Sequence, residues 1–222
     1  MTGARTIIPI GAPIGGGFFA GLMAGDGAPY GLVVAPKAEG DHSGLAWKTD
    51  WLAATPGADS VNDGRANTDA MIRDSINDHP AANWVRGLAI GGFSDWYIPS
   101  RDELEICYRY LKPGRDPNWT YPDRAARWSL PSGKYPGVDN RGNGHNATSE
   151  PPGEAYAKTS PAKTKVKLFR QGGAEAFDTS WYWSSTEFGS AFAWFQYFGD
   201  GYQGLNVKCG HLRVRAVRKI LI

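Results

Sequence analysis

The sequence predicts an α+β fold, a single domain over residues 1–222 in which two helical segments pack on twisted antiparallel strands joined by long ordered loops. Short apolar runs separated by glycine-containing turns occupy residues 1–36 and 181–222, which is typical of strands. Helical spacing of apolar residues occurs between them, within residues 62–111. A chain of 222 residues that is 41% hydrophobic can bury a core without disulfides.

Residues 1–36 are expected to form N-terminal strands and a hairpin. A short strand is expected at residues 6–8, and the apolar runs 17–23 and 30–34 flank a Gly-Asp-Gly sequence. An Asp-Gly pair between two apolar runs favours a tight hairpin, because the turn needs positive φ. We therefore expect two adjacent antiparallel strands here.

Two helical segments are expected in the middle of the chain. Residues 62–86 have apolar side chains on one face, a cap at Asn62 or Asp63, and Pro80 where a shorter helical turn restarts. The second helix begins with Ser100 and Glu103 in capping-box spacing, in which each side chain satisfies a backbone amide of the other. Its apolar face is Leu104, Cys107, Tyr108 and Leu111.

Residues 112–163 form a long insertion that is rich in proline and glycine, with 8 Pro and 6 Gly and no apolar periodicity. Such a loop is either functional or a surface loop that its neighbours, or a second subunit, hold in order. Asp139 to Glu150 partly matches a calcium-binding loop. Arg141 stands where that loop needs an oxygen ligand, so no metal site is predicted.

The chain after residue 163 returns to strands. A short helix or turn is expected between residues 163 and 177, and Asp200-Gly201 favours a second hairpin. Strands are expected at residues 181–186, 191–198, 202–207 and 212–220. In the last of these, apolar and charged residues alternate as in a half-buried strand.

Aromatic residues are concentrated in the segment 181–222, which holds 10 of them. Both alternating rows of residues 192–198 contain aromatic side chains. One row can fill the core, so the other packs against loops, a subunit or a ligand. The sequence alone leaves open which row faces outward, because a register shift of one residue exchanges them. We expect these strands to form a recognition surface.

No arrangement of residues predicts catalysis, a metal site or a cofactor. The four histidines are scattered, and none has the spacing of a metal-binding pair. Ser184-Ser185-Thr186 lacks the glycines of a nucleophile elbow. Glycines 15–17 precede an expected strand, whereas a phosphate cradle precedes a helix.

The bulk composition excludes several classes of partner. A net charge of +2 gives no drive toward nucleic acid or an anionic membrane surface. No apolar run is long enough for membrane insertion, and the N-terminus lacks the features of a signal peptide. Cys107 and Cys209 are expected as two buried thiols, with one long-range disulfide as the alternative.

Three motifs resemble those of a known domain family. They are GGFSDWYIPSRDEL at residues 91–104, YWSSTE at 182–187 and RVRAVR at 213–218. In this order they are similar to motifs of the family named for the C-terminal domain of a Legionella collagen-like adhesin. The resemblance spans residues 29–222 and leaves 112–163 unmatched. It implies a C-type-lectin-like fold, shared with formylglycine-generating enzymes and with the variable proteins of diversity-generating retroelements.

The resemblance also implies structural roles for the motif residues. Trp96 is expected in the core, and Trp183 beneath the helix that begins at Ser100. The Ser184-Ser185-Thr186 hydroxyls are expected to satisfy backbone groups. Arg213 and Arg215 are expected to brace carboxylates such as Glu103 or Glu105.

By analogy with the variable proteins, ligand contacts are expected between the motifs, from Glu187 to His211. The lectin calcium motifs are absent, so a calcium-independent site is expected. The residues proposed for ligand binding are Phe188, Ser190, Phe192, Trp194, Gln196, Tyr202, Gln203, Asn206, Lys208 and His211.

Members of this family occur on bacterial surfaces and in tailed phages. The chain is most similar to the phage versions, which implies a non-enzymatic receptor-binding protein of a tail fibre or tail tip. Its expected partners are a bacterial surface glycan or protein and other tail proteins, in a homotrimer assembled in the virion. The alternatives are a structural tail component without receptor contact, or an enzyme related to the formylglycine generators.

Overall fold

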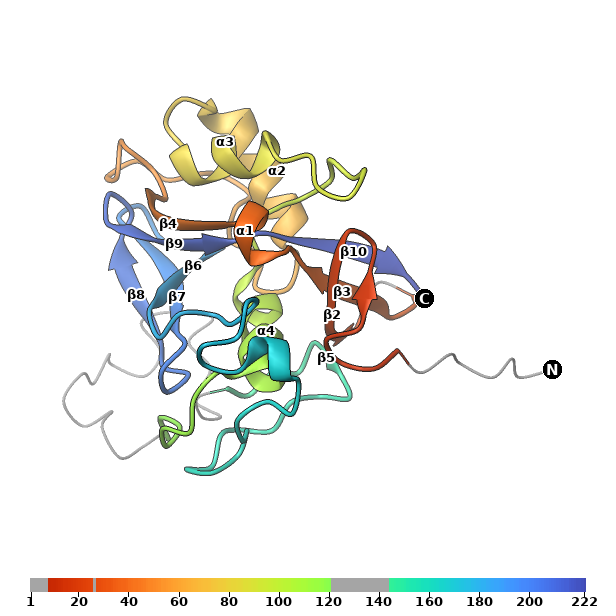
Figure 1. Cartoon of the computed structure of the whole chain (residues 1–222). Helices are drawn as coiled ribbons and strands as arrows, with labels where there is room; N and C mark the ends of the chain where they lie inside the picture. Colours follow the sequence, from red (N-terminus) through yellow and green to blue (C-terminus); the bar gives the residue numbers. More distant parts are fainter. Residues whose placement is uncertain (1–7, 26, 121–143) are drawn as a thin grey trace.

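The computed structural model describes residues 8–25, 27–120 and 144–222 (Figure 1). In these residues the chain forms a mixed α+β structure with four helices and two sheets that are mainly antiparallel. Residues 6–7 of the first expected strand lie outside the described residues, as do Asp26 of the hairpin turn and residues 139–143 of the calcium-like sequence.

The first sheet contains the predicted N-terminal hairpin. Its strand order is β1-β2-β3-β10, and the short β5 also pairs with β2. Strand β2 pairs with β3 in antiparallel register, with Phe18 opposite Val34, which confirms the hairpin. The strands are β1 (Pro13–Ile14), β2 (Gly17–Met23), β3 (Tyr30–Val34), β5 (Ser149–Glu150) and β10 (Val217–Leu221).

The second sheet carries the aromatic strands and has the order β4-β9-β6-β7-β8. All neighbours are antiparallel except β6 and β9, which run parallel and share the single pair Tyr182 and Arg213. Its strands are β4 (Asp41–Ala46), β6 (Trp181–Phe188), β7 (Phe192–Tyr197), β8 (Gln203–Val207) and β9 (His211–Arg215). Gly201, with φ of +79°, provides the turn between β7 and β8 that Asp200-Gly201 predicts.

The expectation of one continuous strand over residues 212–220 is wrong. The chain leaves the second sheet after β9, passes through Ala216 and enters the first sheet as β10 (Figure 1). At this junction the Ala216 N–H donates to the Gly40 carbonyl, and the Ala216 carbonyl accepts from the Ala35 N–H. These bonds to the end of α1 and to the residue after β3 replace the sheet pairing that one strand would have made, and the terminal segment links the two sheets.

The helices follow the sequence closely. The segment 62–86 forms α2 (Gly64–Ser75) and α3 (Pro80–Arg86), and Pro80 lies in the first turn of α3. Helix α4 (Arg101–Leu111) begins with the predicted capping box: Glu103 N–H donates to Ser100 Oγ at 3.3 Å, and Ser100 N–H donates to Glu103 Oε2 at 2.8 Å. The short α1 (Lys37–Gly40) was not predicted, and a 3₁₀ turn covers Lys167–Phe169.

Two clusters of buried side chains fill the interior. Helices α2 and α3 lie on one side of the second sheet and α4 on the other (Figure 1). Trp96 is fully buried, as predicted. Trp183 is also buried, but it belongs to the cluster under α2 and α3 rather than the one around α4. The expectation for Trp183 is therefore wrong about the helix, because its strand position points to the opposite face of the sheet from Tyr182.

Buried polar groups fix the middle of the fold. Glu103 is completely buried and accepts hydrogen bonds from Tyr30 Oη at 2.9 Å, Tyr97 Oη at 2.7 Å and the Gly64 N–H at 3.0 Å. Burial raises the pKa of Glu103, and these donors with the Lys219 charge oppose that effect. Strand β3, the start of α2 and the segment 97–103 therefore meet at one carboxylate.

The two arginines of the terminal motif have different partners from those expected. Arg215 is buried and contacts Asp41 at 3.3 Å and Glu175 at 3.0 Å. Arg213 also contacts Asp41, so the expected pairing with Glu103 or Glu105 is wrong. Glu105 is instead held by Arg109 and by Tyr156 of the long insertion.

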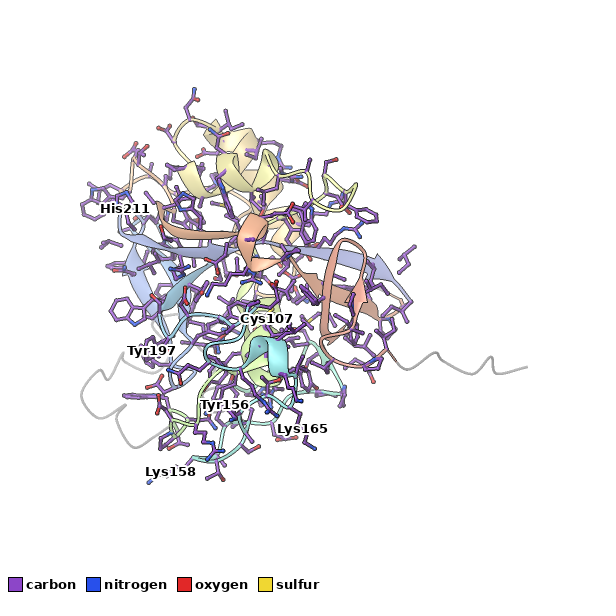
Figure 2. The ribbon with its side chains drawn as sticks, in the orientation of Figure 1. Cys107, Tyr156, Lys158, Lys165, Tyr197 and His211 are labelled. Atoms are coloured by element: carbon purple, nitrogen blue, oxygen red, sulfur yellow. The ribbon has the colours of Figure 1, made fainter. Side chains whose placement is uncertain are left out.

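The cysteines are both free, but only one is buried. Cys107 lies on α4 in the interior (Figure 2), whereas Cys209 is exposed, so the expectation of two buried thiols is wrong for Cys209. The described parts of the insertion pack against α4. Tyr108 Oη donates to Asn118 at 2.7 Å and Tyr156 Oη donates to Glu105 at 2.8 Å, so these parts are ordered by their neighbours.

Candidate binding site

The register of β7 and β8 separates the aromatic residues onto two faces. Successive side chains in a strand alternate between faces, so Phe192 and Trp194 share one face, and Phe195 and Tyr197 share the other. Trp194 pairs with Leu205, and Phe195 with Gly204. Both rows contain side chains that are partly open to solvent, and the proposed ligand-binding residues are divided between them.

The first face carries the predicted residues Phe188, Phe192 and Trp194. The Phe188 and Trp194 rings meet edge to face with centroids 5.7 Å apart, and the Arg101 guanidinium lies 5.3 Å from the Trp194 ring. Phe192 is 42% exposed. The side chain of Gln203, half-buried, lies 3.5 Å from the Arg101 carbonyl.

Gln196 and Lys208 are buried, so neither belongs to the predicted ligand-binding surface. Gln196 Nε2 donates to Tyr156 Oη at 3.2 Å. Lys208 forms a short ion pair with Glu187 and also donates to the Ala53 carbonyl. Burial lowers the pKa of Lys208, and the Glu187 carboxylate opposes that shift. These two side chains support the strands from inside.

The remaining predicted residues lie on or beside the second face. Tyr202 is half-buried between the rings of Phe195, at 5.9 Å, and Trp119, at 5.0 Å. Asn206 is half-buried and its side-chain oxygen accepts from the Val207 N–H. Ser190 lies exposed in the turn after β6, and His211 lies exposed at the start of β9.

An open pocket of about 290 Å³ lies where Trp181 and Tyr197 of this second face come together with residues of β4 and β9. Tyr197 and His211, which contribute to it, lie on the same side of the molecule in Figure 2. The pocket is lined by Ser43, Thr179, Ser180, Trp181, Tyr197, His211, Leu212 and Arg213. His211 is the only predicted ligand-binding residue among these eight.

Trp181 forms the aromatic wall of the pocket. It is 46% exposed, and its ring stacks on Phe195 with centroids 5.0 Å apart and an interplanar angle of 19°. Tyr197 is its cross-strand neighbour. Stacking on a buried ring holds the indole in one orientation and leaves part of it available to a ligand.

Polar side chains complete the rim of the pocket. Among the lining residues, Ser43, Thr179 and Ser180 carry hydroxyls, and Tyr197 and His211 carry a phenol and an imidazole. Within residues 8–25, 27–120 and 144–222, none of these five side chains forms a hydrogen bond with another residue. Their donors and acceptors are therefore available to a bound molecule.

The charge of Arg213, which also lines the pocket, is already balanced by neighbouring carboxylates. Its guanidinium contacts Asp41 at 2.6 Å and Asp178 at 2.7 Å. Burial acts to lower the pKa of Arg213, but Tyr182 and Asp41 outweigh burial and raise it. The arginine is thus a fixed, compensated cation, and the pocket offers neutral hydrogen-bonding groups around an aromatic ring.

Sequence reasoning missed Trp181, Tyr197 and the three hydroxyl residues. Trp181 and Tyr197 were within the aromatic segment, and alternation from Trp183 places Trp181 on the same face as that residue. Ser43 and Thr179 come from segments that only the folded chain brings together, so no local pattern could identify them.

The described residues contain no group of three His, Cys, Asp or Glu side chains that could hold a metal ion. Among the same residues, no helix combines the length and apolar character needed to cross a membrane. Scans of the chain against protein-family models and against curated proteins find no match.

Proposed function

We propose that this chain is a non-enzymatic receptor-binding protein of a phage tail fibre or tail tip, which recognises a glycan or protein on the bacterial surface. The observation that carries the proposal is the open pocket walled by Trp181 and rimmed by polar side chains with no partner in the described residues. Rigid, partly exposed aromatic rings with adaptable hydrogen-bonding neighbours are typical of recognition surfaces.

The finer fold assignment belongs to the same proposal. The capping-box helix, the buried Trp96 and the terminal strands carry the motifs that resemble the collagen-like adhesin domain family. A C-type-lectin-like fold would explain why these motifs serve as framework while the strand surface between them is free for recognition. In this assignment the chain acts in the virion with other tail proteins, as a homotrimer whose three sites add avidity.

The test is binding of the purified chain to intact bacteria across a panel of strains. We expect saturable binding to some strains, weakened about tenfold by Trp181→Ala, because an aromatic anchor of this kind carries more than 1 kcal/mol of binding energy. Leu168→Ala is the matched control: Leu168 is 45% exposed and does not line the pocket, so its loss leaves binding unchanged.

A structural role in the tail is the second candidate. It is favoured by apolar side chains at the end of β10, where Leu221 is 98% and Ile222 47% exposed. A second subunit would cover them. Assembly into oligomers without binding to any strain would favour this role and contradict the receptor-binding proposal.

A further inference from the structure

We propose that the pocket between β6 and β9 binds the ring of an uncharged sugar. The inference rests on the proposed function and names the class of molecule that the site would take. It follows from three properties of the pocket: the exposure of Trp181, the chemistry of the rim, and the pairing of its cation, Arg213, with two carboxylates.

Trp181 presents a flat apolar surface beside polar groups. One face of the indole is stacked on Phe195, and Trp181 is still 46% exposed. A pyranose ring likewise has an apolar face of C–H groups and a polar edge of hydroxyls. The C–H face packs on an indole because the aromatic face is electron-rich and the contact removes apolar area from water.

The rim matches the hydroxyl edge of a sugar. A serine or threonine hydroxyl both donates and accepts hydrogen bonds, and so does a sugar hydroxyl. Ser43 comes from β4, Thr179 and Ser180 come from the loop before β6, and all three line one pocket with Tyr197 and His211. An apolar peptide side chain would leave these groups unpaired on binding, which costs free energy.

The charges beneath the pocket argue for a neutral ligand. Arg213 is engaged by two carboxylates, Asp41 and Asp178, so a carboxylate or phosphate of a ligand would have to compete with both. Asp178 is also paired with Lys37, at 2.7 Å, so the charges beside the pocket are balanced among themselves and offer an anion no unpaired cation. Sialic acids, uronic acids and phosphosugars are therefore disfavoured relative to neutral hexoses.

The size of the pocket fits a single ring. Its volume of about 290 Å³ lies at the lower end of the range for small-molecule sites, and it is open to solvent. A terminal sugar can enter while the rest of a glycan extends away. One such site binds weakly, with a dissociation constant on the order of 1 mM.

The experiment is a titration of the chain with methyl glycosides of glucose, galactose, mannose and N-acetylglucosamine, compared with glucuronic acid and N-acetylneuraminic acid. Binding is followed by tryptophan fluorescence and by saturation-transfer NMR. We expect at least one neutral glycoside to bind more tightly than both acids. Trp181→Ala is expected to weaken that binding about tenfold, and Thr179→Val, which removes a hydroxyl but keeps the shape, to weaken it severalfold.

Trp51→Ala is the matched control, because Trp51 is 37% exposed and does not line the pocket. Preferred binding of an acidic sugar, binding unaffected by both pocket variants, or no binding of any sugar would overturn the inference. Bacterial binding in which no neutral glycoside competes would overturn it while the proposed function stands. Binding of a neutral glycoside by a chain that binds no bacteria would support the inference and count against the proposed function.

Discussion

His79 is a buried titratable residue whose surroundings disfavour its charged form. Its Nδ1 lies 3.0 Å from the Trp47 carbonyl, and its Nε2 lies 3.0 Å from an Asp74 carboxylate that Lys48 also engages at 2.7 Å. Burial lowers the pKa of His79 below its ordinary value of 6.5, although Asp74 and the Trp47 carbonyl oppose the shift. The folded chain therefore binds fewer protons than the unfolded chain as the pH falls through that value.

This difference in proton binding predicts that the free energy of unfolding decreases as the pH falls. The contribution of His79 is present above its unfolded pKa and is lost as the pH falls below it, with a slope of at most about 1.4 kcal/mol per pH unit. Glu103 acts in the opposite sense, because burial raises its pKa. The measurement is the free energy of unfolding in urea between about pH 7.5 and about pH 5.5. A His79→Gln variant should lose less stability over this interval than the wild type, and equal losses would contradict the assignment.

At the scale of elements, the capping box sets the start of α4. Ser100→Ala removes the hydroxyl that accepts from the Glu103 N–H and leaves that buried amide without its partner. We expect a loss of about 1 kcal/mol in the free energy of unfolding. Chemical denaturation checks this, with Ser190→Ala as the control, because Ser190 is exposed in a turn. A loss no larger than that of the control would show that the cap contributes nothing.

The elements with strong local determinants could be predicted from the sequence. The hairpin follows from apolar runs around a glycine turn, and α4 from Ser100 and Glu103 at capping distance. The division of the last strand could not, because Leu212, Val214 and Ala216 keep an unbroken alternation. Whether that alternation continues in one sheet depends on Gly40 and other distant partners.

The site was less predictable than the fold for the same reason. An aromatic segment could be recognised from composition, but the face on which each side chain lies depends on pairing between strands. Lys208 illustrates the difficulty: a lysine in a turn-rich segment is usually solvated, yet here Glu187 and the Ala53 carbonyl hold it inside. Burial of this kind is decided by contacts between residues far apart in sequence.

On the scale of the whole molecule, the terminal strand connects parts that are otherwise distant. Arg218 makes two bonds to Asp95, at 2.7 and 3.0 Å, and the Val217 backbone exchanges hydrogen bonds with that of Tyr97. Removal of residues 217–222 is therefore expected to abolish cooperative unfolding of the entire domain rather than only to fray the first sheet. Thermal unfolding followed by circular dichroism and tryptophan fluorescence tests this.

The control is removal of Leu221 and Ile222 alone, which are exposed at 98% and 47%. That chain should keep a single transition that both probes report together. If the chain that lacks residues 217–222 also unfolds in a single transition, the prediction is contradicted, because the two sheets would then not depend on β10.

The path from β9 through Ala216 into β10 has a consequence for biosynthesis. The first sheet lacks its edge strand, and β4 lacks its neighbour, until the last residues of the domain have been made. Neither half can complete its pairing while these residues are still within the ribosome. Strands β6, β7 and β8 can pair with one another earlier, but the two sheets are joined only after residues 211–221 have emerged, so this joining is a late step of folding.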